Sequence, residues 1–423
     1  MRVLVVGSGG REHALVEAIS RSRLEPEIFC APGNVGTASL GRNVEIPAED
    51  IPALRDFARE NGIELTIVGP EAPLIGGIAD AFYESGLKLF GPSRAAARIE
   101  GSKSFAKEVM GAAGVPTAEH RAFDREQPAL DYLRTHPLPV VVKADGAASG
   151  KGVTVAHSRE EAEAAVREVF GGRFGYPGQC VVIEEHMTGR EVSILAVTDG
   201  EDILPFLPVQ DFKRIYDEDR GPNTGGMGSY SPLPWLEPQT YRRILEEIIR
   251  PTVQHLSMIG SSYTGLLYAG VMVTDEGPKA LEFNCRFGDP ETQALLPRIG
   301  SDLLELMVAC CDGELAGREV GWSAESSVCV VLASDGYPES SSSGDEISGL
   351  DNLPEGVRLY HAATEQRGTK LYTAGGRVLN IVGLGGSLME ARALAYAAAE
   401  LVHFPGMQYR TDIALEAMEL EEF

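Results

Sequence analysis

The segment 281–293 concentrates side chains that can bind metal ions and anions. Glu282 and Asn284 stand two residues apart in a predicted strand, so their side chains share one face of it. Oxygen ligands at this spacing suit Mg²⁺, which takes few protein ligands and completes its coordination with phosphate oxygens. Arg286 and Asp289 follow and together could clamp a small carboxylate, whereas a surface ion pair is the plainer alternative.

A second candidate is the glycine-rich stretch between Lys143 and Gly152. The apolar runs on either side predict a hairpin, and a Gly-rich hairpin can bring backbone N–H groups to phosphates. It is no Walker A loop, because Gly152 replaces the Ser or Thr and a strand follows. We expect Lys143 to bind the α- and β-phosphates of a nucleotide, and Lys151, next to Gly150, to reach the terminal phosphate. Only eight of the 37 basic residues are Lys, which weakens the alternative of a flexible hairpin with two solvated lysines.

The third candidate is the N-terminal turn that contains Gly9 and Gly10 and continues into Arg11 and Glu12. A Gly-rich turn between a strand and a helix lets backbone N–H groups approach a phosphate. A dinucleotide-binding fingerprint would place Gly at position 12, where Glu would disfavour a pyrophosphate. We therefore favour a sugar monophosphate over NAD, with a tight turn that binds no ligand as the alternative.

Two further groups of polar residues are candidates. Glu184 and Glu185, followed by Glu191, could accept hydrogen bonds from ribose hydroxyls, although acidic pairs are usually solvated. The polar, Gly-rich segment 210–230 is predicted to be a long loop that binds a substrate, with an ordinary loop as the alternative. Its candidate residues are Asp211, Lys213, Asn223, Gly225 and Gly226. No His is assigned to catalysis or to a metal, because the His residues show no paired spacing.

The elements that position these residues divide the chain into three parts. Residues 1–101 alternate apolar runs with helical patterns, which predicts an α/β domain with a doubly wound parallel sheet. Residues 102–325 combine long β-rich stretches with a few helices. Residues 326–423 are predicted to form a small α+β domain.

Turns after three predicted strands of the first domain should lie together. In an open parallel sheet, ligands bind beyond the carboxyl ends of the strands. The turns at 7–10, 32–34 and 69–71 should therefore line one crevice, which adds Asn34 and Glu71 to the candidate residues.

Composition excludes several classes of protein. With 62 acidic and 37 basic residues, the formal net charge is −25, which argues against binding to nucleic acid or anionic membranes. The few lysines and many acids fit a high-salt cytoplasm or a GC-rich codon bias equally well. Six Cys without C-x-x-C spacing indicate neither zinc nor a disulfide framework. No apolar stretch approaches the roughly 18 residues of a membrane span, so we expect a soluble, cytoplasmic enzyme.

Six segments carry a resemblance to a known family. They are VVGSGGREHA at the start, TIVGPEAPL at 66–74, GPSRAAARIEGSKSFAK at 91–107, VVKADGAASGKGV at 141–153, GPNTGGMGSYSP at 221–232 and EFNCRFGDPETQ at 282–293. By these segments the chain resembles, end to end, the glycinamide ribonucleotide synthetase family. The resemblance implies an ATP-grasp fold at 102–325, with a lid subdomain at about 115–190. Phe212 departs from the pattern, because most members carry His there.

The resemblance also implies an activity. In this family ATP phosphorylates glycine, and the amine of 5-phosphoribosylamine attacks the resulting glycyl phosphate. The products are glycinamide ribonucleotide, ADP and phosphate, in an early step of de novo purine biosynthesis. Catalysis of this kind rests mostly on positioning and charge neutralisation. The family also suggests a transient contact with the preceding enzyme of the pathway.

Residue roles follow from the same resemblance. Lys103, Lys143 and Lys151 would bind phosphates, and Glu184 and Glu191 would frame the nucleoside. Glu282 and Asn284 would bind Mg²⁺ or Mn²⁺. Asp211, Arg286 and Asp289 would place glycine and the acyl phosphate. Residues 8–12 with Asn34, Glu71 and Lys213 would hold phosphoribosylamine.

Alternatives remain at this stage. One is a different ATP-grasp ligase of the purine pathway, such as a carboxylase or a relative that transfers formyl groups. Another is an ATP-binding regulator without catalysis, and a more distant one is an NAD-dependent dehydrogenase. The strings RFGDPETQ and GPNTGGMG argue against the other ligases, and the intact Lys, Glu and Asn positions argue against the regulator.

Overall fold

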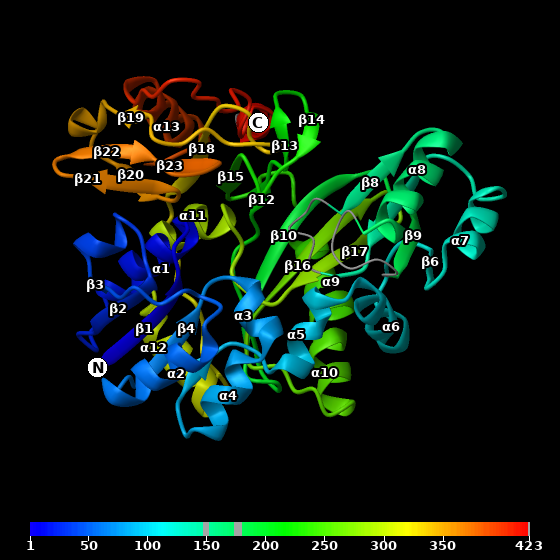
Figure 1. Ribbon diagram of the computed structural model, residues 1–423, viewed down its shortest axis with the longest axis horizontal. Coiled ribbons are helices and arrows are strands. Elements are labelled where there is room, and N and C mark those ends of the chain that lie inside the picture. Colours follow the sequence, from blue (N-terminus) through cyan, green and yellow to red (C-terminus); the bar gives the residue numbers. More distant parts are fainter. Residues whose placement is uncertain (147–151, 173–179, 422–423) are drawn as a thin grey trace.

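The computed structural model describes residues 1–146, 152–172 and 180–421. The N-terminal part lies below the C-terminal part in Figure 1, and the long strands of the central part run beside both. A small lid subdomain projects on the opposite side of those strands. The predicted multidomain architecture is confirmed.

The N-terminal part is a five-stranded parallel sheet in the order β3-β2-β1-β4-β5. Its strands are β1 (Arg2–Gly7), β2 (Glu27–Pro32), β3 (Arg42–Asn43), β4 (Leu65–Val68) and β5 (Leu89–Phe90). Its helices are α1 (Gly10–Ser20), α2 (Ile51–Glu60), α3 (Glu71–Gly76), α4 (Ile78–Glu84) and α5 (Arg94–Gly101). The strand order reverses at β1, so the carboxyl end of β1 opens on the crevice where such sheets bind ligands.

The central part contains a four-stranded antiparallel sheet in the order β11-β10-β16-β17. Its strands are β10 (Arg190–Thr198), β11 (Ile203–Pro205), β16 (Gly265–Thr274) and β17 (Gly277–Asn284). The helices of this part are α6 (Lys103–Ala113), α9 (Pro238–Ile244), α10 (Arg250–Met258), α11 (Glu291–Leu295) and α12 (Leu303–Asp312), with a π-helical turn at Leu245–Ile249 and a 3₁₀ turn at Leu296–Arg298. Helices α6 and α9 contact β17, which carries the predicted metal ligands.

The lid subdomain has a sheet in the order β6-β9-β7-β8. It consists of β6 (His120–Phe123), α7 (Glu126–Leu133), β7 (Val140–Ala144), β8 (Val153–Ala156), α8 (Arg159–Phe170) and β9 (Val181–Glu185). Strands β7 and β8 pair antiparallel, which confirms the predicted hairpin. Buried side chains such as Val142, Val166 and Ile183 form a separate apolar cluster. The two largest clusters instead combine residues from the other parts of the chain, so the lid has a core separate from theirs.

The C-terminal part has a five-stranded sheet in the order β12-β15-β18-β23-β20. Its strands are β12 (Gln210–Asp211), β15 (Gly228–Ser231), β18 (Ser326–Ala333), β20 (Val357–His361) and β23 (Arg377–Gly385), and α13 (Leu388–Leu401) contacts β18 and β23. A small sheet contains β19 (Glu346–Ile347), β22 (Lys370–Thr373) and β21 (Thr364–Arg367). The last described helix is α14 (Leu415–Glu421).

The prediction of a loop at 210–230 was wrong. The segment contains β12, β13 (Arg214–Tyr216), β14 (Arg220–Asn223) and β15, and β15 pairs with the distant strand β18. The two serines of β15 are buried, and each hydroxyl has a partner: Ser229 donates to the carbonyl of Pro290 and Ser231 to that of Pro208. The small polar residues of this segment are typical of a loop, yet they form strands of a sheet.

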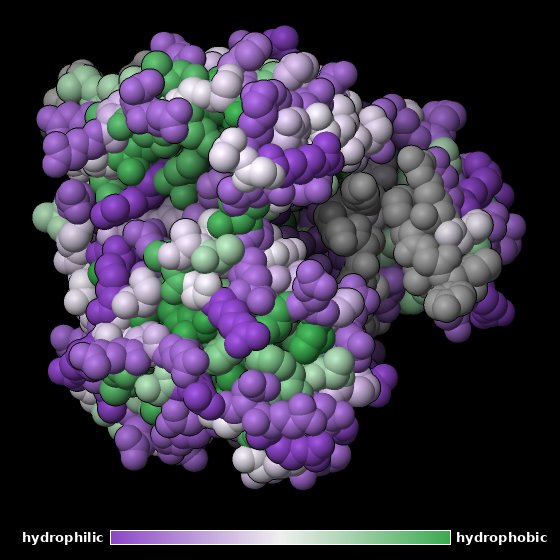
Figure 2. All heavy atoms as spheres, turned by 60° about the vertical axis from the view of Figure 1, so that its left-hand side comes forward, coloured by the Kyte–Doolittle hydropathy of each residue, from purple (hydrophilic) through white to green (hydrophobic). Residues whose placement is uncertain are grey.

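Figure 2 shows both hydrophilic and apolar side chains over the C-terminal part, at the top, and the N-terminal part below it. None of the helices within the described ranges is long and apolar enough to cross a membrane.

Candidate active site

A cavity of about 920 Å³ has a lining from all three parts of the chain. The predicted site residues in its lining are Arg11, Glu71, Lys103, Lys143, Gly152, Glu184, Glu185, Glu191, Asp211, Lys213, Asn223, Gly225, Glu282, Asn284, Arg286 and Asp289. The lining does not include Gly9, Gly10, Glu12, Asn34 or Gly226. Gly150 and Lys151 lie outside the described residues.

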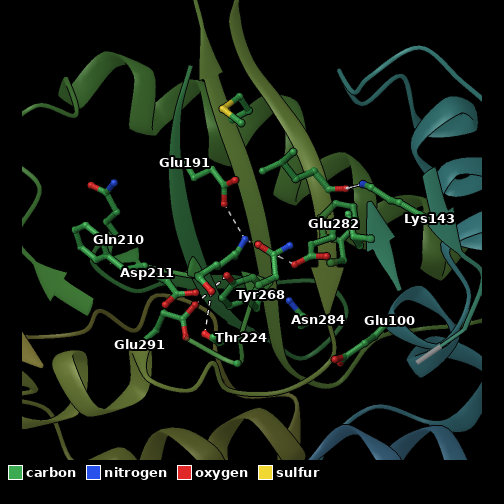
Figure 3. A pocket seen from close by; sticks show the side chains of 18 of the residues that line it. Glu100, Lys143, Glu191, Gln210, Asp211, Thr224, Tyr268, Glu282, Asn284 and Glu291 are labelled. Carbon is green, nitrogen blue, oxygen red and sulfur yellow. Dashed lines mark hydrogen bonds and ion pairs between the residues drawn. The ribbon is translucent and has the colours of Figure 1, made fainter. Parts of the chain in front are cut away.

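Strand β17 presents the two predicted metal ligands to this cavity. Glu282 and Asn284 line it and are partly exposed, whereas Phe283 between them is buried in the apolar core and reaches the lining from there. Figure 3 shows both side chains on the same side of the strand. Burial alone would raise the pKa of Glu282, but the surrounding cations, Lys213 first, hold it below the usual value. An ionised carboxylate beside an amide oxygen is a suitable partial ligand set for a divalent cation.

Lys213 lies between carboxylates of two strands. Its ammonium is 2.8 Å from Glu191 on β10 and 4.0 Å from Glu282 on β17. Burial by itself would lower the pKa of Lys213, but the neighbouring acidic groups, Glu191 first, raise it well above the usual value. Lys213 is therefore cationic and close to the predicted metal ligands.

A buried charge cluster lies where the lid meets α6. Glu184 on β9 is only 2% exposed, and its carboxylate is 2.8 Å from the ammonium of Lys143 and 3.3 Å from that of Lys107. Lys107 also donates to the hydroxyl of Thr117 at 2.7 Å. Burial, the largest effect, lowers the pKa of Lys107 to about 8 despite the carboxylate. Both of the ion pairs that Glu184 makes are thus buried.

The start of α6 brings Lys103 to the same end of the cavity. Ser102 caps the helix by accepting from the backbone N–H of Phe105 at 3.2 Å. Lys103 donates to the carbonyl of Gly146 at 2.9 Å, and Asp145 accepts from the hydroxyl of Ser104 at 2.5 Å. These contacts hold the phosphate-binding candidate against the end of β7.

Arg286 and Asp289 have different ion-pair partners within the chain, and their expected joint clamp on a small carboxylate stays a prediction. Arg286 is 3.2 Å from Glu71 and 3.1 Å from Glu100, and both of these acids belong to the N-terminal part. Glu100 also accepts from the backbone N–H of Cys285 at 2.7 Å. Asp289 pairs instead with Arg377 of the C-terminal part, at 3.3 Å. Residues close in sequence are therefore held by charges far away in the chain.

A second group of acids surrounds Tyr268 on β16. The Tyr268 hydroxyl donates to Glu291 at 2.9 Å and is 2.8 Å from the hydroxyl of Ser193. Asp211 lies beside them in Figure 3. Burial first, and then Glu291, raises the pKa of Asp211 well above its usual value. Among the described residues, Oδ1 of Asp211 has no hydrogen-bond partner although it is buried.

The N-terminal turn is held by its own side chains. Glu12 accepts from the backbone N–H of Gly9 at 2.5 Å and from Arg11 at 2.6 Å. The Asn34 amide donates to the carbonyls of Gly9 and His361 at 3.2 and 2.7 Å. Asn34 and Glu12 thus position the turn, and their contact with a substrate stays a prediction.

Phe212, where the resemblance implies a His, has a packing role in the structure. Its ring lies 6.1 Å from that of Tyr230, and the Arg410 guanidinium sits 4.8 Å from the ring centroid. Arg410 also pairs with Asp219 and Asp412 at 2.7 Å each. The aromatic ring therefore covers a cation that is only 1% exposed.

Sequence reasoning missed several residues that line the cavity. Glu291 and Lys107 belong to strings that carried the resemblance, yet their charge in a buried position was not recognised. Glu100 also lies in one of these strings, whereas Tyr268 and Arg377 lie in strand patterns without any local sign of a site. Only their position in three dimensions identifies them.

Comparisons with known proteins agree with this geometry. Residues 1–100, 101–292 and 327–416 match the N domain, the ATP-grasp (A) domain and the C domain of phosphoribosylglycinamide synthetase. A phosphoribosylamine–glycine ligase of Vibrio vulnificus (strain YJ016) is 48% identical over 427 residues, which cover 100% of both chains. A crystal structure of phosphoribosylamine–glycine ligase from Thermotoga maritima has a TM-score of 0.85 and 35% identity, and covers 97% of this chain and 100% of its own.

A more distant likeness concerns the fold alone. The biotin carboxylase domain of Hydrogenobacter thermophilus 2-oxoglutarate carboxylase, solved with MgADP and bicarbonate, has a TM-score of 0.73 at 17% identity. The alignment covers 100% of this chain and 94% of the biotin carboxylase domain. With family domains matched along most of its length and relatives 48% identical over all of it, the chain belongs to the phosphoribosylglycinamide synthetase family.

Proposed function

We propose that this chain joins glycine to 5-phosphoribosylamine at the expense of ATP, giving glycinamide ribonucleotide, ADP and phosphate in purine (IMP) biosynthesis. The name phosphoribosylamine–glycine ligase, carried by relatives 48% identical over the whole chain, supports this function. The observation that carries it is one cavity whose lining combines lysines, Lys103 and Lys143 among them, with acids and with the arginines Arg286 and Arg377. Such a cavity suits a triphosphate together with a small zwitterion.

The end of the cavity that contains Lys103 and Lys143 is assigned to ATP. We assign phosphate contacts to Lys103 and Lys143. Contacts with the nucleoside are assigned to Glu184, Glu185 and Glu191, which all line the cavity. Glu282 and Asn284 would hold Mg²⁺ or Mn²⁺, which when bound neutralises phosphate charge. Catalysis then rests on the alignment of the terminal phosphate with the glycine carboxylate rather than on a covalent enzyme intermediate.

The other end is assigned to glycine and the acceptor amine. A carboxylate is a poor acyl electrophile, so its phosphorylation to glycyl phosphate must precede attack by the amine of phosphoribosylamine. We assign the placing of glycine and its acyl phosphate to Asp211, Arg286 and Asp289. The crevice beyond β1, with Arg11 and Glu71 nearby, is assigned to the phosphoribosyl group.

The proposal extends to the cellular setting. We propose a cytoplasmic enzyme that receives its labile amine in a transient contact with the preceding enzyme of the pathway. The net charge of −25 is in keeping with small-molecule substrates rather than nucleic acid.

The test is ADP release from Mg-ATP, glycine and phosphoribosylamine generated in the cuvette, with each component omitted in turn. The proposal requires release to depend on all three. Release that continues without glycine would point to another acid substrate, and dependence on bicarbonate or formate instead would indicate another ATP-grasp ligase. Binding of ADP without turnover on any substrate pair would indicate a regulator.

A further inference from the structure

Arg377 brings the C-terminal part into the cavity. It is the first residue of β23, and its side chain is 21% exposed and contributes to the lining. One terminal nitrogen, Nη1, donates to the carbonyls of Gly225 and Asp289 at 2.6 and 2.8 Å, with that of Gly226 at 3.4 Å. The other, Nη2, is 3.3 Å from the Asp289 carboxylate. One guanidinium therefore joins three segments that are far apart in sequence.

The segment that Arg377 holds is built to fit closely. Gly226 has a φ of +106°, a backbone conformation that L side chains rarely adopt. A Cβ at this position would come within 2.3 Å of Pro290. A Cβ at Gly225 would lie 3.0 Å from the guanidinium carbon of Arg377. The Gly225–Gly226 turn thus lies directly against both Arg377 and the Asp289–Pro290 peptide.

Arg377 also sets the charge of Asp289. Burial alone would raise the pKa of Asp289, but Arg377 is the strongest of the groups that lower it below the usual value. Gln293 donates to the same carboxylate at 2.7 Å. A planar guanidinium can serve two carbonyls and a carboxylate at once, whereas a lysine ammonium is a single point charge.

We propose that Arg377 is a positioning residue through which the C-terminal part assembles the amino-acid end of the cavity. It holds the Gly225–Gly226 turn and Asp289 in register with each other. The lysines at the nucleotide end belong to other elements, so loss of Arg377 should impair the use of glycine and spare the binding of ADP. This inference rests on the proposed function, because Asp289 and the turn are assigned there to substrates.

The test compares full-length Arg377→Gln and Arg377→Lys with the unchanged chain. Displacement of reacting groups by about 1 Å can cost ~100-fold in rate, so kcat/KM for glycine should fall by about that factor in Arg377→Gln. The dissociation constant of ADP, measured by calorimetry, should stay within about twofold. The kcat/KM of Arg377→Lys should exceed that of Arg377→Gln by less than about tenfold, because an ammonium cannot replace the two terminal nitrogens of the planar guanidinium. The matched control is Arg358→Gln on the neighbouring strand β20, at a side chain 48% exposed.

A second perturbation leaves Arg377 itself in place. Gly225→Ala would press a methyl group against the guanidinium, and it should lower kcat/KM for glycine with ADP binding unchanged. The inference is refuted if Arg377→Gln uses glycine as well as the unchanged chain does, or if ADP binding falls in parallel with glycine use. It is also refuted if Arg377→Lys restores full activity. Failure of the unchanged chain to require glycine would instead refute the proposed function.

Discussion

Glu184→Gln should destabilise the protein strongly, because it removes the negative partner of two buried lysines. Glu184, Lys107 and Lys143 have side chains that are 2%, 4% and 8% exposed, and the two ion-pair distances are 3.3 and 2.8 Å. Breaking a buried pair by removal of one partner costs about 3–5 kcal/mol, since a charge is left in a medium of low polarity. The adjacent Glu185→Gln is the control: its carboxylate is 36% exposed and 3.9 Å from Lys279, so its loss should cost less than about 1 kcal/mol.

The cost of Glu184→Gln should depend on pH. In the folded chain the pKa of Lys107 is about 8, below its usual 10.5, so the unfolded state binds more protons between these values and stability rises with pH there. Without Glu184, which raises it, the pKa of Lys107 should fall further. Lys107 of the variant can then lose its proton at neutral pH. The difference in free energy of unfolding between the unchanged chain and the variant should therefore shrink from pH 6 to pH 9.

Urea unfolding followed by circular dichroism at several pH values measures both effects. A loss below about 1 kcal/mol at pH 7, or a deficit equal for the two glutamates, would refute the assignment of a buried cluster. A deficit that grows toward pH 9 would contradict the direction of the Lys107 shift.

Three further predictions concern the site. Lys143→Ala should lower turnover by about 100-fold or more, and unchanged kcat and KM for ATP would remove Lys143 from the nucleotide end. Glu282→Ala should raise the Mg²⁺ concentration needed for half-maximal rate by about tenfold or more, and a titration that overlays that of the unchanged chain would contradict the metal assignment. Phe212→His should lower the free energy of unfolding by about 1 kcal/mol through weaker contact with Arg410, with kcat retained; a loss of activity without a loss of stability would show that the ring serves the site.

Local pattern was enough to predict the elements whose burial is decided locally. The continuous apolar runs of β1 and β4 are typical of buried strands. The alternation of Glu282, Phe283 and Asn284 is typical of a half-buried strand. The parallel sheet, the hairpin of the lid and the shared face of the metal ligands followed from these periods.

Pairing between distant segments was beyond the reach of such patterns. Strand β15 joins the C-terminal sheet because Tyr230 pairs with Val328, and nothing near Tyr230 in the chain indicates that partner. The sequence predicts that Arg286 and Asp289 clamp a small carboxylate, but nothing near Arg286 indicates its partners Glu71 and Glu100, which are separated from it by most of the central part. Side-chain charge alone predicts that a partner exists and leaves its identity open.

The scarcity of lysine carries more information than any single motif. Lys103, Lys107, Lys143 and Lys213, half of the eight in the chain, line one cavity. An ammonium is a compact charge suited to phosphate, whereas the many arginines serve carbonyls and carboxylates elsewhere through a planar fork. Buried lysines are costly without counter-charges, and Glu184 supplies one to Lys107 and Lys143. Glu191 and Glu282, on two other strands, pair with the partly exposed Lys213. The lysines of the cavity are therefore balanced by strands of both the lid and the central sheet, so the geometry of the cavity depends on how those two sheets are joined.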